Sequence, residues 1–150
     1  VTGRLKFDVA APPARSVADV TPHLARRPML IAASTLKGED EILLDTLDRL
    51  RETTPDACLV LAPRHPERFD AVTALAARPD WRVVRRSELA GVPIGAVDVL
   101  VLDTIGELAA LCEAATVVFV GGSLVPAGGH NILEPARVGR AVVVGPSMSN

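Results

Sequence analysis

The apolar run Met29-Leu-Ile-Ala-Ala33 and its longer counterpart Ala57-Cys-Leu-Val-Leu-Ala62 decide the fold class of this chain. Neither run alternates apolar with polar residues, which predicts strands that are buried on both faces. A strand of that kind belongs to a parallel sheet that is covered by helices on either side. The two runs therefore predict an α/β domain.

The alternation of strand and helix continues outward from these runs. Because the connections are short, successive units should form right-handed crossovers. We predict a doubly wound, Rossmann-like parallel sheet whose ligand lies outside the carboxyl ends of the strands. The further predicted strands are 81–84, 97–102, 116–120 and 141–144, and the predicted helices are 17–26, 39–51, 67–77, 105–114 and 134–138.

The composition of the 150 residues excludes several classes of protein. Hydrophobic residues make up 49% and charged residues 23%, which excludes a disordered or fibrous chain. Aromatic residues make up only 3% and the net charge is −2, so neither stacking platforms nor a broad basic surface is available for nucleic acid. Any anion must therefore be bound by a local site.

The cysteines and histidines lack the spacing of a disulfide framework or a metal site. Cys58 and Cys112 lie in apolar runs, which favours buried free thiols in a reducing compartment. His23, His65 and His130 are far apart in the sequence, so no metal site is predicted. No signal peptide or membrane-spanning run is present, and we expect a soluble piece of a longer protein.

Polar residues and glycines follow the predicted strands, where a doubly wound sheet binds its ligand. Three of them have local alternatives: Ser34 and Thr35 could cap the next helix, and Arg64 could be a surface ion-pair partner. These residues are Ser34 and Thr35 after the first strand, Arg64 and His65 after the second, Asp103, Thr104 and Gly106 after the fourth, and Gly121, Gly122 and Ser123 after the fifth.

A glycine-rich loop follows the fifth predicted strand. Gly121-Gly122 and Gly128-Gly129 bracket a segment that can present backbone N–H groups to an anion. Pro135 suits the first position of the next helix, which puts Glu134 at the helix start. The helix N-terminus favours a phosphate and Glu134 can accept hydrogen bonds from sugar hydroxyls, so together they indicate a nucleotide. In the alternative, Asn131 caps the helix and Glu134 completes a capping box.

Other nucleotide-binding and catalytic motifs are absent. The sequence has no GxGxxG fingerprint and no phosphate-binding loop that ends in Gly-Lys-Ser or Gly-Lys-Thr. Gly121-Gly-Ser-Leu-Val125 lacks the final glycine of a nucleophile elbow, which argues against a hydrolase. The basic run Arg82, Arg85 and Arg86 is interpreted as a solvated edge, with an anionic membrane surface as the alternative.

At these residues the sequence resembles the 3-deoxy-D-manno-octulosonic acid (Kdo) transferases of lipid A biosynthesis. The chain departs from the pattern at Leu36, where the family usually has His, and at Arg4, where Asn is common. The longest matching stretch is Phe119-Val-Gly-Gly-Ser-Leu-Val-Pro-Ala-Gly-Gly-His-Asn-Ile-Leu-Glu-Pro-Ala136. The others are Gly3–Asp8, Ala33–Glu39, Leu61–Phe69, Asp103–Leu108 and Gly145-Pro146 with Asn150.

The family is similar to two-domain GT-B glycosyltransferases, and this resemblance implies the domain organisation. Residues 1–27 would form an interdomain connector with a leading helix. Residues 28–150 would form a CMP-sugar-binding Rossmann-like domain, incomplete at its C-terminus and lacking the N-terminal acceptor domain. The full enzyme would transfer Kdo from CMP-Kdo to a lipid A precursor, lipid IVA, at the cytoplasmic face of the bacterial inner membrane, without a metal cofactor.

The partners that the resemblance implies are CMP-Kdo, the lipid A precursor through the missing N-terminal domain, and the membrane surface through the full-length protein. Nucleic acid is not among them. The catalytic base would lie in the N-terminal domain, so no catalytic residue is predicted in this chain, and we expect the chain alone to be inactive.

The resemblance also implies a role for each strand-end residue. The phosphate of the leaving CMP would be stabilised by Arg64, by the Ser34 and Thr35 hydroxyls, and by loop N–H groups near Gly122-Ser123 and His130-Asn131. Glu134 would hold the ribose hydroxyls. The turn from Asp103 to Gly106 would lie beside the base, with Ile105 packing on it. The predicted donor site is Ser34, Thr35, Arg64, His65, Asp103, Thr104, Ile105, Gly106, Gly122, Ser123, Gly128, Gly129, His130, Asn131 and Glu134.

Two other functions stay open on the residues alone, because spacing does not distinguish cytosine from uracil. One is a nucleotide-sugar site in a UDP-sugar transferase or epimerase. The other is a non-enzymatic interaction or regulatory module, which would bind no nucleotide. The family motif favours the Kdo transferase.

We expect the substitution Glu134→Ala to weaken CMP binding about tenfold, because charge-assisted hydrogen bonds to the ribose would be lost. Titration of the folded variant with CMP measures this effect. Unchanged affinity would mean that Glu134 serves only as a helix-start residue.

Overall fold

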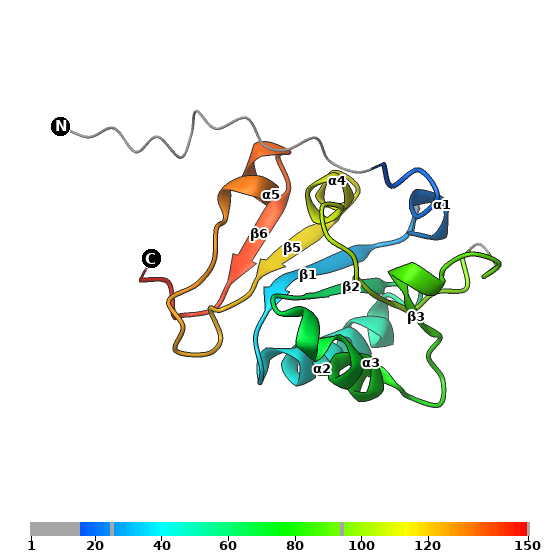
Figure 1. Ribbon diagram of the computed structural model, residues 1–150, viewed down its shortest axis with the longest axis horizontal. Coiled ribbons are helices and arrows are strands. Elements are labelled where there is room, and N and C mark those ends of the chain that lie inside the picture. Colours follow the sequence, from blue (N-terminus) through cyan, green and yellow to red (C-terminus); the bar gives the residue numbers. More distant parts are fainter. Residues whose placement is uncertain (1–15, 25, 94, 150) are drawn as a thin grey trace.

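The computed structural model describes residues 16–24, 26–93 and 95–149, and it confirms the doubly wound α/β class. In this part of the chain six strands form one parallel sheet in the order β3-β4-β2-β1-β5-β6 (Figure 1). The strands are β1 (Met29–Thr35), β2 (Cys58–Pro63), β3 (Val83–Arg85), β4 (Val99–Val101), β5 (Val117–Val120) and β6 (Ala141–Val144).

Helices cover both faces of this sheet. The helices α2 and α3 lie on one face, while α1, α4 and α5 lie on the other (Figure 1). The helices are α1 (Thr21–Leu24), α2 (Glu39–Thr53), α3 (Phe69–Ala76), α4 (Leu108–Cys112) and α5 (Leu133–Arg137), with short 3₁₀ helices η2 (Pro66–Arg68) and η3 (Arg86–Glu88).

The two faces of β1 explain why its sequence is apolar throughout. Successive side chains of a strand point to opposite faces. Leu30 and Ala32 join the cluster under α2 and α3, while Met29 and Ile31 join the cluster under α1 and α4. Each face therefore needs apolar residues, as the run predicts.

Several predicted elements have different bounds in the structure. The predicted helix 105–114 begins only at Leu108, because Gly106 adopts a φ of +91° that a helix cannot continue through. The predicted helix 17–26 contains a single turn of α-helix, α1. The predicted helix 67–77 is split between η2 and α3, and the predicted strand 97–102 shortens to β4. Residues 1–15 of the predicted connector lie outside the described residues.

The start of α5 also differs from the prediction. The helix begins at Leu133, so Glu134 and Pro135 are its second and third residues, and Pro135 is not at the first position. Pro135 remains in the first turn, where the helix does not use its missing N–H.

The end of β1 bulges next to the end of β5. The register of β1 against β2 shifts between Ala33 and Thr35, and Ser34 adopts a left-handed φ of 56°. Gly121, directly after β5, packs against this bulge. A Cβ atom at position 121 would overlap the Ser34 carbonyl oxygen and lie 2.8 Å from the Thr35 Cα. A glycine is therefore required for the two strand ends to lie together.

We expect Gly121→Ala to lower the free energy of unfolding by about 3 kcal/mol, the upper end of the range for overpacking, because the clash is with backbone atoms. Urea denaturation measures the loss. Gly91→Ala is the matched control: Gly91 has a φ of +81° with open space around the added methyl group, so about 1 kcal/mol of backbone strain is expected there. Equal losses in the two variants would contradict the close approach at Gly121.

Candidate functional site

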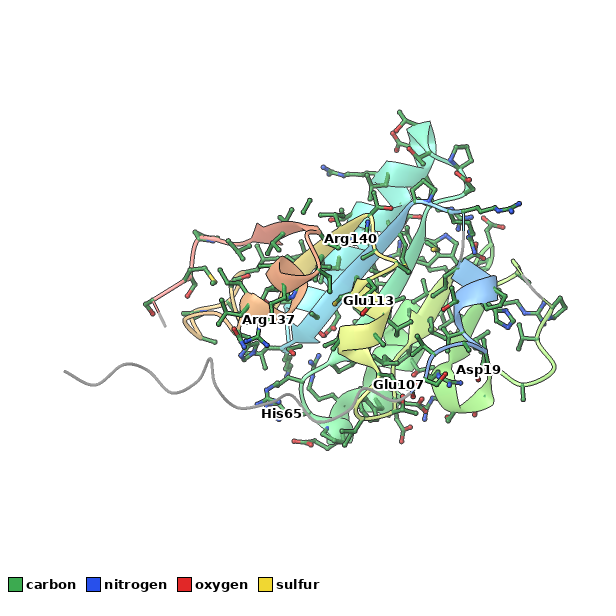
Figure 2. All side chains as sticks on the ribbon, turned by 90° about the horizontal axis from the view of Figure 1, so that it is seen from above. Asp19, His65, Glu107, Glu113, Arg137 and Arg140 are labelled. Atoms are coloured by element: carbon green, nitrogen blue, oxygen red, sulfur yellow. The ribbon has the colours of Figure 1, made fainter. Side chains whose placement is uncertain are left out.

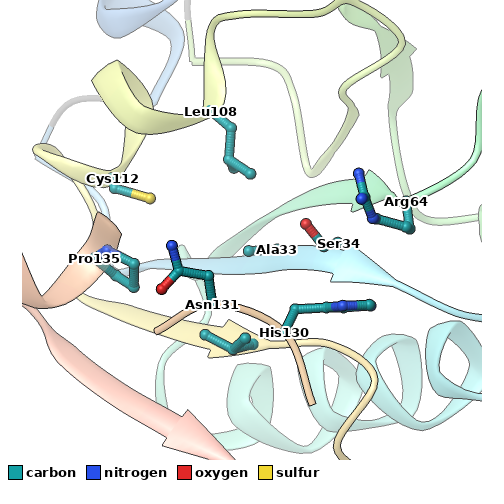
Figure 3. Close-up of a pocket in the computed structure, with 9 residues that line it drawn as sticks. Ala33, Ser34, Arg64, Leu108, Cys112, His130, Asn131 and Pro135 are labelled. Carbon is teal, nitrogen blue, oxygen red and sulfur yellow. The ribbon is translucent and has the colours of Figure 1, made fainter. Parts of the chain in front are cut away.

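A cavity of about 240 Å³ opens at the carboxyl ends of β1 and β5 (Figure 3). From β1 the chain proceeds to β2 on one side, whereas β5 and β6 lie on the other side of β1. This is the switch point at which a doubly wound sheet leaves a crevice for a ligand. The cavity is lined by Ala33, Ser34, Arg64, Leu108, Cys112, Val120, His130, Asn131 and Pro135.

Four of the predicted site residues meet at this cavity. Ser34 and Arg64 extend from the ends of β1 and β2, and His130 and Asn131 reach the cavity from the segment before α5 (Figure 3). The Arg64 N–H donates to the Thr35 carbonyl at 2.9 Å, which anchors the backbone of an otherwise exposed residue. The cavity thus combines a hydroxyl, a guanidinium, an imidazole and an amide, which are suitable donors for a phosphorylated ligand.

The Asn131 side chain has a local role as well. Its Oδ1 accepts a hydrogen bond from the Leu133 N–H at 2.9 Å. This Asx turn leads into α5. The bond resembles the alternative in which Asn131 caps the helix, because its donor, Leu133, is the first residue of α5. The capping box would also need the Glu134 side chain, which lies outside the described part of the structure.

The Thr35 hydroxyl, which is predicted to meet a phosphate, and the hydroxyl of the predicted site residue Ser123 are both directed into the protein. The buried Thr35 hydroxyl donates to Asp40 Oδ1 at 2.6 Å. The buried Ser123 hydroxyl donates to the Val120 carbonyl and accepts a hydrogen bond from the Gly145 N–H at 2.9 Å. Both side chains therefore stabilise strand ends and do not line the cavity.

The N–H groups of Gly122 and Ser123, which are predicted to meet a phosphate, already have an acceptor in Glu39. The carboxylate of this fully buried residue accepts hydrogen bonds from the N–H groups of Gly122 at 2.9 Å, Ser123 at 3.0 Å and Leu124 at 3.0 Å. It also accepts one from the Leu36 N–H at 2.8 Å. In this structure the Gly122 and Ser123 amides are therefore bonded to Glu39, and their contact with a phosphate stays a prediction.

The glycines at the end of the loop are also held by the protein. The Gly128 N–H donates to the Ser147 Oγ at 3.2 Å, and the Gly129 N–H donates to the Gly122 carbonyl at 2.7 Å. Both glycines are buried and have a φ of +80°. The His130 N–H donates to the Gly121 carbonyl at 3.2 Å, which closes the loop on itself. The loop is thus a folded wall of the cavity.

The predicted residues after β4 form a separate turn. The Asp103 carboxylate accepts hydrogen bonds from the N–H and hydroxyl of Ser87, and the Thr104 hydroxyl donates to Glu107. Gly106 lets this turn reach α4, whose Leu108 does line the cavity. Ile105 stays 74% exposed, which leaves its side chain available to a ligand.

Two arginines of the basic run around β3, Arg85 and Arg86, form ion pairs. Arg86 Nε contacts Glu107 at 2.8 Å and its Nη1 contacts Asp19 at 2.9 Å, and these two acids lie side by side (Figure 2). Arg85 contacts Asp70 at 2.5 Å. These pairs favour the interpretation of a solvated edge over that of a membrane-binding surface.

The main electrostatic feature of the cavity is the lowered pKa of His130. Burial lowers the pKa of His130 below its ordinary value of 6.5, and the nearby Arg64 and His65 lower it further, while Glu39 acts in the opposite direction. His130 Nε2 is buried without a hydrogen-bond partner. His65 itself is exposed beside Arg64 at the start of η2. At neutral pH the His130 ring is therefore uncharged, and it lies at the same cavity as the Arg64 guanidinium.

Neither Cys58 nor Cys112 forms a disulfide, and both are buried, as predicted. Burial raises the pKa of the Cys58 thiol to about 11, so this thiol stays protonated and unreactive at neutral pH. Cys112 contributes to the cavity wall. Among the described residues, no group of three or more His, Cys, Asp or Glu side chains is placed to hold a metal ion, and the absence of a metal cofactor remains a prediction.

Sequence reasoning missed Glu39, the residue that organises the loop. The available signal was chemical: a glycine-rich loop after a strand exposes N–H groups that need an acceptor when buried. Glu39 follows Lys37-Gly38 at the start of a helix, where an acidic residue is usually interpreted as favouring the helix dipole.

Comparisons with known proteins give consistent results. No family model matches the chain. A 3-deoxy-D-manno-octulosonic acid transferase from Bordetella pertussis is 40% identical over 100% of this chain and 36% of its own length. The enzyme of the same name from Haemophilus influenzae is 44% identical over 79% of this chain and 28% of its own length. The chain thus spans about a third of the curated relatives that it matches.

A solved structure matches the fold as well as the sequence. The crystal structure of the C-terminal CMP-Kdo binding domain of WaaA from Acinetobacter baumannii has a TM-score of 0.77 and 35% sequence identity, covering 87% of this chain and 68% of that chain. Sequence and structure therefore agree over most of both domains. The chain belongs to the family of 3-deoxy-D-manno-octulosonic acid transferases and matches their C-terminal part.

Proposed function

We propose that this chain is the donor-binding domain of a glycosyltransferase that transfers Kdo from CMP-Kdo to a lipid A precursor. One observation carries this proposal: the cavity at the switch point between β1 and β5 gathers Ser34, Arg64, His130 and Asn131. The solved neighbour, a CMP-Kdo binding domain, supports the same ligand for this fold and sequence.

Arg64 and Ser34 are proposed to hold the phosphate of CMP-Kdo. When the bond between Kdo and the phosphate oxygen breaks, the departing CMP gains negative charge on that phosphate. Arg64 offers a guanidinium whose backbone is anchored to Thr35, and Ser34 offers a hydroxyl on a bulge whose left-handed backbone is fixed by packing against Gly121. Donors that are already in place stabilise such charge without reorganising during the reaction.

The remaining wall of the cavity supports specificity and exclusion of water. Leu108, Val120 and Pro135 supply apolar surface next to the polar donors, the combination that is typical of small-molecule sites. The exposed Ile105, on the turn before α4, is proposed to pack on the cytosine base. The Glu134 side chain is proposed to hold the ribose hydroxyls.

The rest of the reaction is proposed to lie with the longer protein. The acceptor and the catalytic base belong to the N-terminal domain in this proposal, which assigns the full-length enzyme to the cytoplasmic face of the inner membrane and requires no metal. Among the helices of residues 16–24, 26–93 and 95–149, none combines the length and the apolar character that crossing a bilayer requires.

We expect the chain to bind CMP more tightly than UMP and Arg64→Ala to weaken CMP binding about ten- to hundredfold, because a charge-assisted contact to the phosphate is lost. Residue-by-residue NMR titration measures both, with shifts expected at Ser34, Arg64 and Asn131. Arg49→Ala on α2, an exposed arginine on the other face of the sheet, is the matched control.

Three results of this titration would overturn the proposal. Equal affinity for UMP and CMP would favour a UDP-sugar transferase or epimerase. The absence of nucleotide binding would favour an interaction module. Equal effects of Arg64→Ala and Arg49→Ala would exclude Arg64 from the phosphate site.

We expect the His130 imidazole to titrate below pH 6.5 in the free chain and at a higher pH with CMP bound, because a nearby phosphate favours the protonated ring. Since the folded-state pKa lies below the unfolded value, unfolding takes up a proton, and stability should fall as the pH drops from about 6.5 through the folded-state pKa. Imidazole NMR measures the pKa, and urea denaturation of wild type and His130→Gln measures the pH dependence. The same pH dependence in both proteins would contradict this assignment.

A further inference from the structure

The first turn of α2 carries two adjacent acidic side chains that are fully buried, Glu39 and Asp40. Asp40 accepts a hydrogen bond from the Thr35 hydroxyl and forms an ion pair with Arg68 of η2. Arg68 Nη1 in turn donates to the Thr35 carbonyl at 3.1 Å. Asp40 therefore ties the end of β1 to the segment that follows β2.

Glu39 ties the same strand end to the segment after β5. Its Oε2 accepts from the Leu36 and Gly122 N–H groups, and its Oε1 accepts from the Ser123 and Leu124 N–H groups. Successive backbone N–H groups that converge on one point form an anion-binding concavity, or nest. In this chain the anion in the nest is the protein's own carboxylate.

The nest is directly behind the wall of the cavity. A Cβ atom on Gly122 would lie 2.9 Å from His130 Nε2, so Gly122 and the imidazole are in close contact. The Gly122 carbonyl accepts from the Gly129 N–H at 2.7 Å, and the Gly121 carbonyl accepts from the His130 N–H at 3.2 Å. A displacement of Gly122 would therefore move His130 and, with it, one side of the cavity.

We infer that Glu39 is a positioning residue of the donor site: its carboxylate fills the nest of residues 122–124 and thereby holds the His130 wall and directs the ligand's phosphate to Ser34 and Arg64. The inference rests on the proposed function, because it concerns where CMP binds. Glu39 is buried and does not line the cavity, so it acts through Gly122 and not by touching the ligand.

The wild-type chain gives a first test that needs no substitution. On addition of CMP, the amide resonances of Ser34 and Arg64 should move more than those of Ser123 and Leu124, whose N–H groups remain bonded to Glu39. Scalar coupling between ³¹P of CMP and the ¹⁵N of Gly122, Ser123 or Leu124 would mean that the phosphate occupies the nest, which would overturn the inference.

The second test is Glu39→Gln, with Glu41→Gln as the matched control on the same turn, where Glu41 is exposed. The glutamine keeps the shape but has one acceptor oxygen for four N–H donors. At a temperature where both variants are folded, Glu39→Gln should weaken CMP binding about tenfold or more. It should also shift the Gly122 and His130 resonances before any CMP is added, whereas Glu41→Gln should change neither.

The third test separates positioning from stability by chemical rescue. Glu39→Ala removes the carboxylate and leaves the nest open, so added formate should bind there and restore CMP affinity and the wild-type resonances of residues 122–124. Acetamide at the same concentration, which is neutral, should not.

The outcomes distinguish this inference from the proposed function. A folded Glu39→Gln variant with wild-type CMP affinity overturns the inference and leaves the proposed function standing. Failure of formate to restore CMP affinity in a folded Glu39→Ala variant also overturns it. Absence of CMP binding by the wild-type chain overturns the proposed function, and the inference with it.

Discussion

A carboxylate without exposed surface is stable only where protein donors replace the water that it has lost. Glu39 meets this condition through four backbone N–H groups, from the end of β1 and from the loop after β5. Those N–H groups in turn need a buried acceptor. Neither partner is satisfied without the other, so the interaction binds together two segments separated by more than 80 residues. The bulge at Ser34 and the packing of Gly121 against it lie between these segments and depend on their alignment.

The cavity has two parts, a base whose polar groups are bonded within the protein and a rim whose polar groups can contact a ligand. The base consists of strand ends whose polar groups are bonded within the protein: the Thr35 hydroxyl with Asp40, the Ser123 hydroxyl with Val120 and Gly145. The rim consists of Arg64, which is exposed, and of Ser34, His130 and Asn131 around the opening. A rim held on such a base can offer its donors to a ligand with little reorganisation, which is the condition for stabilising charge on a leaving phosphate.

The hydrophobic pattern of the sequence predicted the strands and the edge of the sheet at which the site lies. Continuous apolar runs predicted the parallel strands, and the rule for strand ends predicted that Ser34, Arg64, His130 and Asn131 would gather at one place. Patterns did not reveal which way a polar side chain points. The positions of Thr35 and Ser123 after strands predict them at the cavity, yet hydrogen bonds to Asp40 and to Val120 and Gly145 hold their hydroxyls inside the protein. The predicted start of the helix at residue 105 was wrong for a related reason. The φ of Gly106, and not the apolar pattern, sets where α4 begins.

The amino-acid order alone specified the fold class and the chemical nature of the site, because burial on both strand faces and the position of strand ends follow from hydrophobic pattern. Three-dimensional packing decided which polar groups are bonded within the protein and which stay available to a ligand. Glu39 and the glycine-rich loop are far apart along the chain, and only the neighbouring positions of β1 and β5 in the sheet bring them together. Once they meet, a charged acceptor inside the protein satisfies the loop N–H groups that would otherwise be free for a phosphate. The loop sequence indicates that an acceptor is needed, but it does not identify which residue supplies it.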